Sequence, residues 1–316
     1  MVDRGLTSLE PQAAPAVLMV RPAGFGHNAE TASSNFFQHA AERPGDEAAH
    51  ALREFDALAL ALARAGVRVI ELAGQRDAAL PDEVFPNNWL SLHSDGTAVL
   101  YPLLAPIRRR ERRTDVLAEL REWHGYRIAR VVDLTHFESR GEFLEGTGSL
   151  VLDRPHRTAY ACLSPRTHAA PLAELCRTLD YEAITFRAID RAGRPIYHTN
   201  VLLGIGTRFA AVCTAAIADP AERHAVVARL EDTGHELVDL DFDQLETFAG
   251  NLLELRGSRG PVIALSARAL RSLDTGAQRA LERHGELVTA DVATIERIGG
   301  GSVRCMLAEV ALPNAK

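Results

Sequence analysis

The amino-acid sequence contains a weak repeat that limits how the chain can fold. In each copy, strand-like apolar runs are followed by a helical pattern and then by a β-branched run. Five copies follow one another along the chain. Because one such unit cannot cover its own apolar face, we expect the copies to pack together around a common core.

The sequence pattern gives the ranges of the five units. The first has an apolar run at 17–20, a helical pattern over 47–65 and a strand at 67–70. Each later unit has two strands, a helix and a third strand: 89–92, 98–101, 111–123 and 128–132; 149–152, 159–162, 173–178 and 183–186; 200–203, 209–213, 221–231 and 236–240; 252–255, 261–265, 277–284 and 287–289. The turn Ser94-Asp95-Gly96 indicates a hairpin in the second unit.

A last strand-like run at 303–312 is left over. If it completes the first unit, the units form a ring without an exposed strand edge. We therefore predict one α/β domain over 1–316 with fivefold pseudosymmetry. The alternative is an ordinary doubly wound sheet with a C-terminal hairpin. Against it, no phosphate-binding glycine fingerprint follows a strand, and Gly299-Gly300-Gly301 precedes a strand without the required helix.

The composition is typical of a globular protein that acts on small molecules. The 316 residues are 47% hydrophobic and 24% charged, which allows a sizeable core. The net charge of −7 offers no basic surface for nucleic acid, and the basic run at 108–113 is expected to be a solvated helix face. No signal peptide or membrane-spanning run is visible, so we expect a cytoplasmic protein without membrane contacts. A homo-oligomer is left open.

The cysteines and histidines lack the spacing of a disulfide scaffold or a metal site, so we expect free thiols, no metal and no cofactor. The four cysteines are Cys162, Cys176, Cys213 and Cys305. The histidines without metal-ligand spacing include His93, His136, His156, His168 and His224. Ser164 and Ser302 lack a nucleophile elbow, which argues against a serine hydrolase.

Polar segments that are unusual in β-strands lie near the first strand of each unit. They are Asp82 with Asn87-Asn88, Glu145 to Gly148, His198 to Asn200, Asn251, and Ser302 to Cys305. In a ring of such units, equivalent positions converge on one axial cavity. The sequence therefore predicts a composite active site there.

Cys305, His198 and Glu145 could together form a nucleophilic site. Each has a simpler interpretation: a buried hydrophobe, a structural histidine and a surface carboxylate. Their predicted convergence favours chemistry, because a thiolate is the effective nucleophile and a nearby histidine, oriented by a carboxylate, can move protons. The glycines at 299–301 would let the backbone approach closely here.

These residues resemble the guanidine-modifying, or pentein (amidinotransferase), superfamily, which contains arginine deiminases, dimethylarginine dimethylaminohydrolases and amidinotransferases. The resemblance extends from Met19 to Pro313 and implies an α/β propeller of five ββαβ units. Several segments look like those of bacterial citrulline-utilisation hydrolases (citrullinase type): Met19 to Pro22, Phe85 to Trp89, Glu145 to Ser149, Ile196 to Val201, and Gly299 to Met306.

The resemblance implies roles for individual residues. Cys305 would be the nucleophile, His198 the general acid/base and Glu145 the adjacent carboxylate. Asp82 matches the residue that contacts the substrate α-amine in dimethylarginine hydrolases. The remaining substrate-binding candidates are Arg108 and Arg166, whose guanidinium groups suit a carboxylate, and the amides Asn87, Asn88 and Asn200.

Two departures from the superfamily pattern bear on the substrate. Arginine deiminases have aspartates at the positions matched by Asn88 and Asn200, because a buried guanidinium needs anionic partners. Neutral amides suit a ureido group, so the sequence predicts hydrolysis of L-citrulline to ornithine, ammonia and carbon dioxide through a covalent thiol intermediate.

Other functions remain open on the sequence alone. An arginine deiminase or dihydrolase, or a dimethylarginine hydrolase, would act on a guanidino amino acid, whereas an amidinotransferase would need an amine acceptor. A catalytically silent propeller could bind an amino acid without reaction. The segment 25–38 is long, polar and aromatic-tipped, which suggests a lid over the site.

Overall fold

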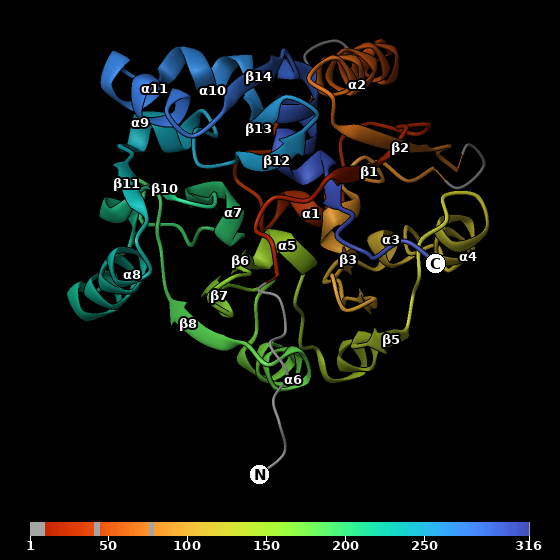
Figure 1. Ribbon diagram of the computed structural model, residues 1–316, viewed down its shortest axis with the longest axis horizontal. Coiled ribbons are helices and arrows are strands. Elements are labelled where there is room, and N and C mark those ends of the chain that lie inside the picture. Colours follow the sequence, from red (N-terminus) through yellow and green to blue (C-terminus); the bar gives the residue numbers. More distant parts are fainter. Residues whose placement is uncertain (1–9, 41–44, 76–78, 316) are drawn as a thin grey trace.

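The computed structural model describes residues 10–40, 45–75 and 79–315. The strands form five three-stranded sheets, one for each predicted unit. In every sheet, the middle strand pairs antiparallel with one neighbour and parallel with the other. Figure 1 shows the units arranged around a common centre, as expected for an α/β propeller of five ββαβ units.

The first unit is built from both ends of the chain. Its strands are β1 (Ala16–Val20), β2 (Arg68–Leu72) and β15 (Ala308–Glu309), in the order β15-β1-β2. The connection from β1 to β2 holds the short helix α1 (Ala29–Ala32) and the long helix α2 (Glu47–Arg64). The prediction that the last run completes the first unit is therefore confirmed, because Leu18 pairs with Ala308 and Val17 with Glu309.

The other four units follow the predicted order. The second contains η2 (Pro86–Asn88), β3 (Leu90–Leu92), β4 (Thr97–Leu100), α3 (Pro106–Arg109), α4 (Asp115–Glu122), β5 (Arg130–Asp133) and η3 (Thr135–Arg140). The third contains α5 (Gly146–Ser149), β6 (Val151–Asp153), β7 (Thr158–Cys162), α6 (Ala169–Leu179) and β8 (Glu182–Phe186).

The fourth unit contains α7 (Thr199–Leu202), β9 (Leu203–Ile205), β10 (Phe209–Val212), η4 (Thr214–Ala216), α8 (Pro220–Asp232), β11 (Glu236–Asp239) and α9 (Phe242–Glu246). The fifth contains β12 (Leu253–Gly257), β13 (Gly260–Ser266), α10 (Ala267–Ser272), α11 (Thr275–Glu282) and β14 (Glu286–Ala290). The π-helical turn η5 (Ile295–Gly299) and the 3-10 turn η6 (Val303–Met306) lead back to β15.

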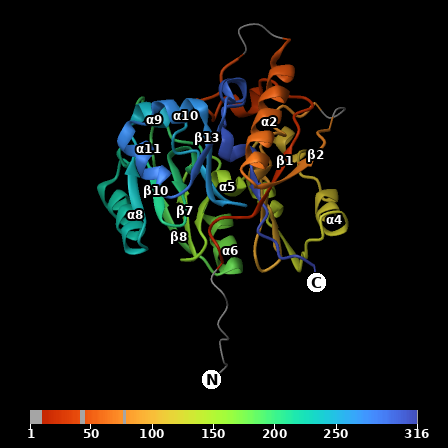
Figure 2. The ribbon, with the colours of Figure 1, turned by 45° about the horizontal axis from the view of Figure 1, so that its top comes forward.

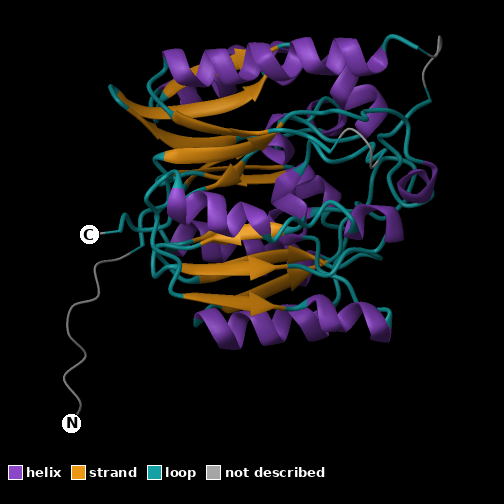
Figure 3. Ribbon diagram, turned by 90° about the vertical axis from the view of Figure 1, so that its right-hand side faces the viewer, coloured by secondary structure: helices purple, strands orange, loops and turns teal. Residues whose placement is uncertain are grey.

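The long helices lie outside the sheets. Figure 1 shows α2, α4, α6, α8 and α11 at the periphery, and Figure 2 shows α2 running along the outside of β1 and β2. In Figure 3 the strands lie between outer helices at the top and bottom of the view. The apolar residues of α2 recur at three and four positions, so that Ala51, Phe55, Leu58 and Leu62 are buried on one face.

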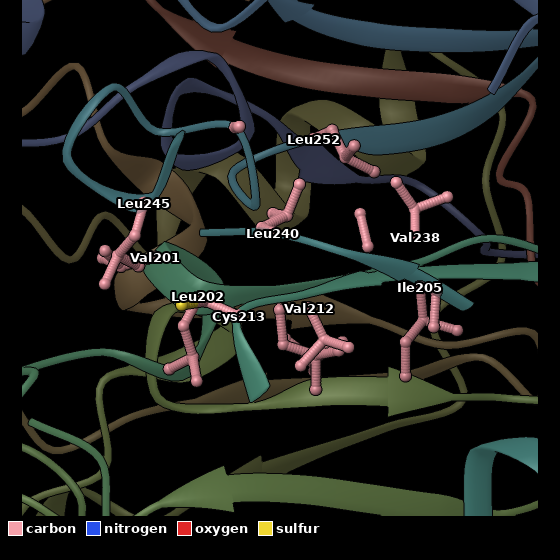
Figure 4. Close-up of a cluster of buried hydrophobic side chains, with 14 of the residues drawn as sticks. Val201, Leu202, Ile205, Val212, Cys213, Val238, Leu240, Leu245 and Leu252 are labelled. Carbon is pink, nitrogen blue, oxygen red and sulfur yellow. The ribbon is translucent and has the colours of Figure 1, made fainter. Parts of the chain in front are cut away.

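The apolar cores are shared between neighbouring units. One cluster joins Phe186 of the third unit, Val212 of the fourth and Ile263 of the fifth. Figure 4 shows the part of this cluster around the fourth unit, where side chains from α7, β9, β10 and β11 meet Leu252 of the fifth. Because each sheet buries its apolar surface against the next unit, the units depend on one another for a core.

Among the described helices, none combines the length and apolarity needed to cross a membrane.

Several predicted strand starts were wrong in the same way. Residues 149 and 200–202 lie in the single helical turns α5 and α7, and the strands begin at Val151 and Leu203. The predicted strand at 303–312 is mostly the turn η6 followed by the two-residue β15, so Cys305 lies on a turn. These helical turns precede the first strand of their units and carry the polar segments. The predicted helix 111–123 also begins later, at Asp115.

Candidate active site

The polar segments lie at one end of the ring because each comes just before the first strand of its unit. Asn88 ends η2 before β3, Glu145 precedes α5, His198 precedes α7, Asn251 precedes β12, and Cys305 lies in η6 before β15. The short turns pack together, α5 against η2 and α7, and η2 against η6. The predicted convergence of these segments is therefore observed.

Two glycines allow this close packing. Gly146 has a φ of +47°, and a Cβ there would lie 2.2 Å from the carbonyl oxygen of Asn87. A Cβ on Gly148 would lie 2.5 Å from Asn88 Nδ2 and 2.7 Å from the His198 ring. Since real Cβ atoms do not approach other atoms so closely, glycine is required at both positions.

His198 and Glu145 form a buried hydrogen-bonded pair. The His198 Nε2 lies 2.9 Å from Glu145 Oε2, and the other carboxylate oxygen accepts the backbone N–H of Leu104 at 3.0 Å. Burial raises the pKa of Glu145, but Arg166, His198 and Arg108 outweigh burial and hold that pKa well below its usual range. Burial lowers the pKa of His198 to about 4, although Glu145 opposes this. The pair is therefore a carboxylate and a neutral imidazole at neutral pH.

Two amide groups hold the Cys305 sulfur. Asn200 Nδ2 and Asn251 Nδ2 each lie 3.4 Å from Cys305 Sγ. Asn251 also accepts the backbone N–H of Arg304 at 3.0 Å and donates to the Asn200 carbonyl at 2.9 Å. Two N–H donors facing one sulfur suit a thiolate nucleophile. Asn251 had been noted in a polar segment, but its contact with the sulfur was not predicted.

Two buried oxygen atoms near the cavity have no hydrogen-bond partner among the described residues: Asp82 Oδ1 and Asn200 Oδ1. The second oxygen of Asp82 accepts from Asn28 at 2.7 Å and from Thr31 at 3.3 Å. Burial raises the pKa of Asp82, while Arg108 and these hydrogen bonds lower it. Because buried acceptors normally find a donor, both free oxygens are suited to bind N–H groups of a ligand.

Arg108 is one of the most buried side chains, and the expectation of a solvated face for its run was wrong at this position. Its guanidinium donates to Glu111 at 2.9 Å and to Asn88 Oδ1 at 2.7 Å, and it lies 3.7 Å from Asp82. Glu111 had not been identified as part of the site. These carboxylates raise the pKa of Arg108 against the effect of burial, so Arg108 is a fixed positive charge in the wall of the cavity.

Arg166 connects the site to the segment 25–38. It lies 3.4 Å from Glu145 and donates to the Thr31 carbonyl at 2.9 Å and to Ser34 Oγ at 2.8 Å. Its guanidinium also lies over the Tyr197 ring, 5.0 Å from the centroid. Asn35 of the same segment donates to the Gly300 carbonyl at 3.0 Å. The segment therefore covers the cavity, whereas its opening as a lid stays a prediction.

A small cavity lies between these groups. Its lining includes Cys305, His198, Asn88, Asp82, Arg108 and Arg166, together with Tyr197 and the glycines at 299–301. Its free volume is about 10 Å³, which is room for about one water molecule. Three predicted site residues do not line this cavity. Glu145 contacts it through His198, Asn200 lies beside Cys305, and Asn87 accepts a hydrogen bond from Asn88 Nδ2 at 3.1 Å. An amino acid could enter only after a covering residue moves.

The fold and this set of side chains define the class of the protein. It is a hydrolase of the pentein (amidinotransferase) superfamily, which acts on C–N bonds other than peptide bonds. The chain belongs to the family described as "N,N dimethylarginine dimethylhydrolase, eukaryotic", whose model matches residues 21–312. The predicted superfamily is thereby confirmed, and the narrower likeness to citrulline-utilisation hydrolases stays a prediction.

Solved structures support the same fold. The N-terminal domain of ArgZ, an arginine dihydrolase from the ornithine–ammonia cycle in cyanobacteria, has a TM-score of 0.71 and 16% identity over 93% of this chain and 97% of that domain. AgrE in complex with ornithine and NAD+ has a TM-score of 0.73 and 19% identity over 95% of this chain, but only 40% of AgrE. A dimethylarginine dimethylaminohydrolase adduct has a TM-score of 0.62 and 15% identity over 93% of this chain and 99% of that one. No curated protein sequence matches significantly.

Proposed function

We propose that this protein hydrolyses the ureido group of L-citrulline, with Cys305 as the nucleophile. The observation that carries this proposal is the neutral surrounding of the sulfur. Its hydrogen-bond donors are the amides of Asn200 and Asn251, and the free Oδ1 of Asn200 is available to accept a ureido N–H. Glu145, the acid paired with His198, is already held by Arg166 and a backbone N–H. A guanidinium placed at the sulfur would therefore lack a free carboxylate partner among these groups.

Asp82 and the two arginines that line the same cavity suit the α-amino and α-carboxyl groups of an amino acid. The unpartnered Asp82 Oδ1 suits an ammonium group, and the two arginines supply positive charge for a carboxylate. Arg108 is fixed by Glu111 and Asn88, whereas Arg166 is bound by Thr31 and Ser34 of the covering segment. Arg166 is therefore the better candidate, because movement of that segment would free its guanidinium.

The chemistry follows from these positions. The neutral His198 accepts the thiol proton as the Cys305 sulfur attacks the ureido carbon. The resulting imidazolium, stabilised by Glu145, protonates the terminal nitrogen, and the C–N bond breaks to release ammonia. A thiocarbamate then joins the Cys305 sulfur to the δ-nitrogen side of the substrate. Attack by water on this carbon restores the thiol and gives a carbamate, which loses carbon dioxide to leave ornithine.

A guanidino amino acid is the second candidate substrate. The family model is named for dimethylarginine, and ArgZ is described as an arginine dihydrolase. Of the acids near the two arginines of the cavity wall, Asp82 has an unpartnered oxygen that a guanidinium could use. Burial raises the pKa of Glu111 to about 8, so Glu111 adds little negative charge at neutral pH. Complete hydrolysis of arginine to ornithine also contains the hydrolysis of a ureido group. The two proposals thus differ in the first substrate and share the last step.

Product analysis distinguishes these functions. The purified protein is incubated separately with L-citrulline, L-arginine and dimethylarginine, and ornithine, citrulline and ammonia are measured. We expect ornithine from citrulline, and none in the Cys305→Ala variant. If arginine yields citrulline that accumulates while added citrulline is not consumed, the protein is a deiminase and the proposal is wrong. Release of dimethylamine from dimethylarginine alone would also contradict it.

A further inference from the structure

A second cluster of possible ligand side chains lies away from the catalytic cavity. Asp153 is the last residue of β6, His156 lies in the turn from β6 to β7, and His235 comes just before β11. His156 Nδ1 lies 2.8 and 3.0 Å from the two oxygens of Asp153, and His235 Nε2 lies 3.9 Å from Asp153 Oδ2. Each of the three residues offers one donor atom, and these three atoms all lie within 4.8 Å of one another.

This cluster lies at the far end of the sheets from the nucleophile. Glu145 precedes β6, whereas Asp153 ends it, so these two carboxylates lie at opposite ends of the same strand. His235 likewise precedes β11, whose partner β10 begins at Phe209 on the same side. The cluster is therefore separate from the cavity around Cys305.

The buried members of the cluster are oriented for binding. Asp153 and His235 have side chains only 1% exposed, and His156 is 36% exposed. His235 Nδ1 lies 3.3 Å from the Leu230 carbonyl and 2.9 Å from Thr233 Oγ1, whose hydroxyl donates to the Arg229 carbonyl at 2.8 Å. These contacts suit a proton on Nδ1, and in that tautomer the Nε2 lone pair faces the Asp153 carboxylate. A cation bound between the lone pair and the carboxylate would stabilise this arrangement.

An unpartnered hydroxyl lies beside the same group. The Tyr160 hydroxyl is buried and has no hydrogen-bond partner among the described residues. Thr158, two residues before it on β7, pairs directly with Asp153 on β6, so Tyr160 and Asp153 are diagonal neighbours on one face of the sheet. Asp153 adds to burial in raising the pKa of Tyr160. This hydroxyl could bond a water molecule bound to an ion.

We propose that Asp153, His156 and His235 bind a divalent metal ion of the zinc type. Two imidazoles and one carboxylate are a ligand set that zinc accepts, whereas magnesium and calcium prefer oxygen ligands alone. Tetrahedral zinc, with bonds of about 2.0–2.1 Å, places its ligand atoms about 3.3 Å apart. Asp153 Oδ2 lies 3.0 Å from His156 Nδ1 and 3.9 Å from His235 Nε2, and all three donor atoms lie within 4.8 Å of one another, so small side-chain movements would bring them to this spacing. The exposed side of His156 leaves the fourth position open to water.

The ion would connect two neighbouring units of the ring. Asp153 and His156 belong to the hairpin of the third unit, and His235 belongs to the α8–β11 connection of the fourth. The spacing of histidines and acids along the sequence could not indicate this site, because the ligands come from two units and only the fold brings them together. Bound metal would stabilise the folded state, since the unfolded chain has no such arrangement.

The test uses untagged, metal-free protein carrying Cys305→Ala, so that the catalytic thiol cannot bind metal. Titration with Co²⁺ should give the visible absorption bands of a tetrahedral site at one equivalent, and Zn²⁺ should displace them. His156→Ala, at an exposed position, should weaken binding by about tenfold or more. His136→Ala, which removes an exposed histidine of the second unit, is the matched control and should leave affinity unchanged.

Asp153→Asn provides a second variant that keeps the side-chain shape, and it should also weaken binding. Zn²⁺ should raise the melting temperature of the Cys305→Ala protein and of the His136→Ala control, but not that of the His156→Ala variant. Absence of Co²⁺ binding would overturn the proposal. Equal affinity in the His156→Ala and His136→Ala proteins would overturn it as well.

Discussion

Asn251 accepts the backbone N–H of Arg304 through Oδ1 and donates to Cys305 Sγ through Nδ2, at 3.0 and 3.4 Å. One amide thus fixes both the turn that carries the nucleophile and the sulfur itself. Because Asn251 comes from the fifth unit and Cys305 from the segment that returns to the first, the nucleophile is positioned by the closure of the ring.

We predict that Asn251→Ala lowers kcat more than it changes KM. A hydrogen bond to a charged group contributes about 1.5–3 kcal/mol, which corresponds to roughly tenfold to a hundredfold in rate. Asn251→Asp keeps the acceptor for the Arg304 N–H but places a negative charge beside the sulfur. The Cys305 thiol of this variant should therefore react more slowly with iodoacetamide than that of the alanine variant. If both variants retain full kcat, the role assigned to Asn251 is wrong.

Replacement of Glu145 should affect catalysis through His198. Glu145→Gln keeps the shape of the side chain but removes the charge that stabilises an imidazolium, so kcat should fall by roughly a hundredfold or more. Glu142→Gln in the same loop is the control and should retain activity. Steady-state kinetics with citrulline measure the effect, with circular dichroism to check the fold. A Glu145→Gln protein as active as the control would exclude Glu145 from proton transfer.

The buried histidines should make the protein less stable as the pH falls. Burial lowers the pKa of His198 and of His93 to about 4, whereas an exposed histidine has a pKa near 6.5. Between these pH values the two histidines bind more protons in the unfolded chain than in the folded protein, so their contribution to the free energy of unfolding decreases as the pH is lowered from about 6.5 to about 4. Burial raises the pKa of Glu111 to about 8, and this carboxyl group contributes in the opposite direction.

Urea unfolding at a series of pH values measures this decrease. The His198→Asn variant, which removes one of the histidines with a lowered pKa, should show a shallower dependence on pH than the wild type over the same range. A pH dependence of stability in the His198→Asn variant that equals that of the wild type would contradict the neutral state assigned to His198.

Gly148 should not tolerate a side chain. A Cβ there would overlap Asn88 Nδ2 and the His198 ring, so Gly148→Ala should displace the histidine and lower kcat by at least about tenfold. Gly276→Ala is the control, because a Cβ at Gly276 meets only Asp274 Oδ1 at 3.1 Å, within the first turn of α11. Thermal melting and kinetics should be measured together. Normal kcat in Gly148→Ala would show that the His198 position is not critical.

The sequence was most informative about the repeated pattern. Periodic apolar residues located α2 and α8 closely, and the leftover run at the end indicated the pairing that closes the first unit. The helical turns α5 and α7 were mistaken for strand starts, since Leu150, which follows α5, and Val201 and Leu202 of α7 are all buried and show no periodicity. The prediction of one domain over 1–316 stays a prediction.

The sequence indicated which candidate residues would lie together where each of them belonged to a recognisable segment. Cys305, His198, Asn88 and Asp82 line one cavity, as expected from their positions before the first strands. The charge pattern of the run at 108–113 did not indicate the burial of Arg108, whose place among the site candidates came only from the family resemblance, because Arg108 acquires its partner Asn88 only on folding. For the same reason the sequence did not indicate that Arg166 bonds to Thr31.

The most direct test of the account is to follow the ureido carbon during turnover. Citrulline carrying an isotopic label in that carbon is mixed with the protein, the reaction is quenched, and the peptide containing Cys305 is analysed by mass spectrometry. We predict labelled carbonyl on Cys305, labelled carbon dioxide in solution and an equal amount of ornithine. Ornithine and carbon dioxide formed without label on Cys305 in single-turnover samples, or no ornithine from citrulline at all, would contradict the account.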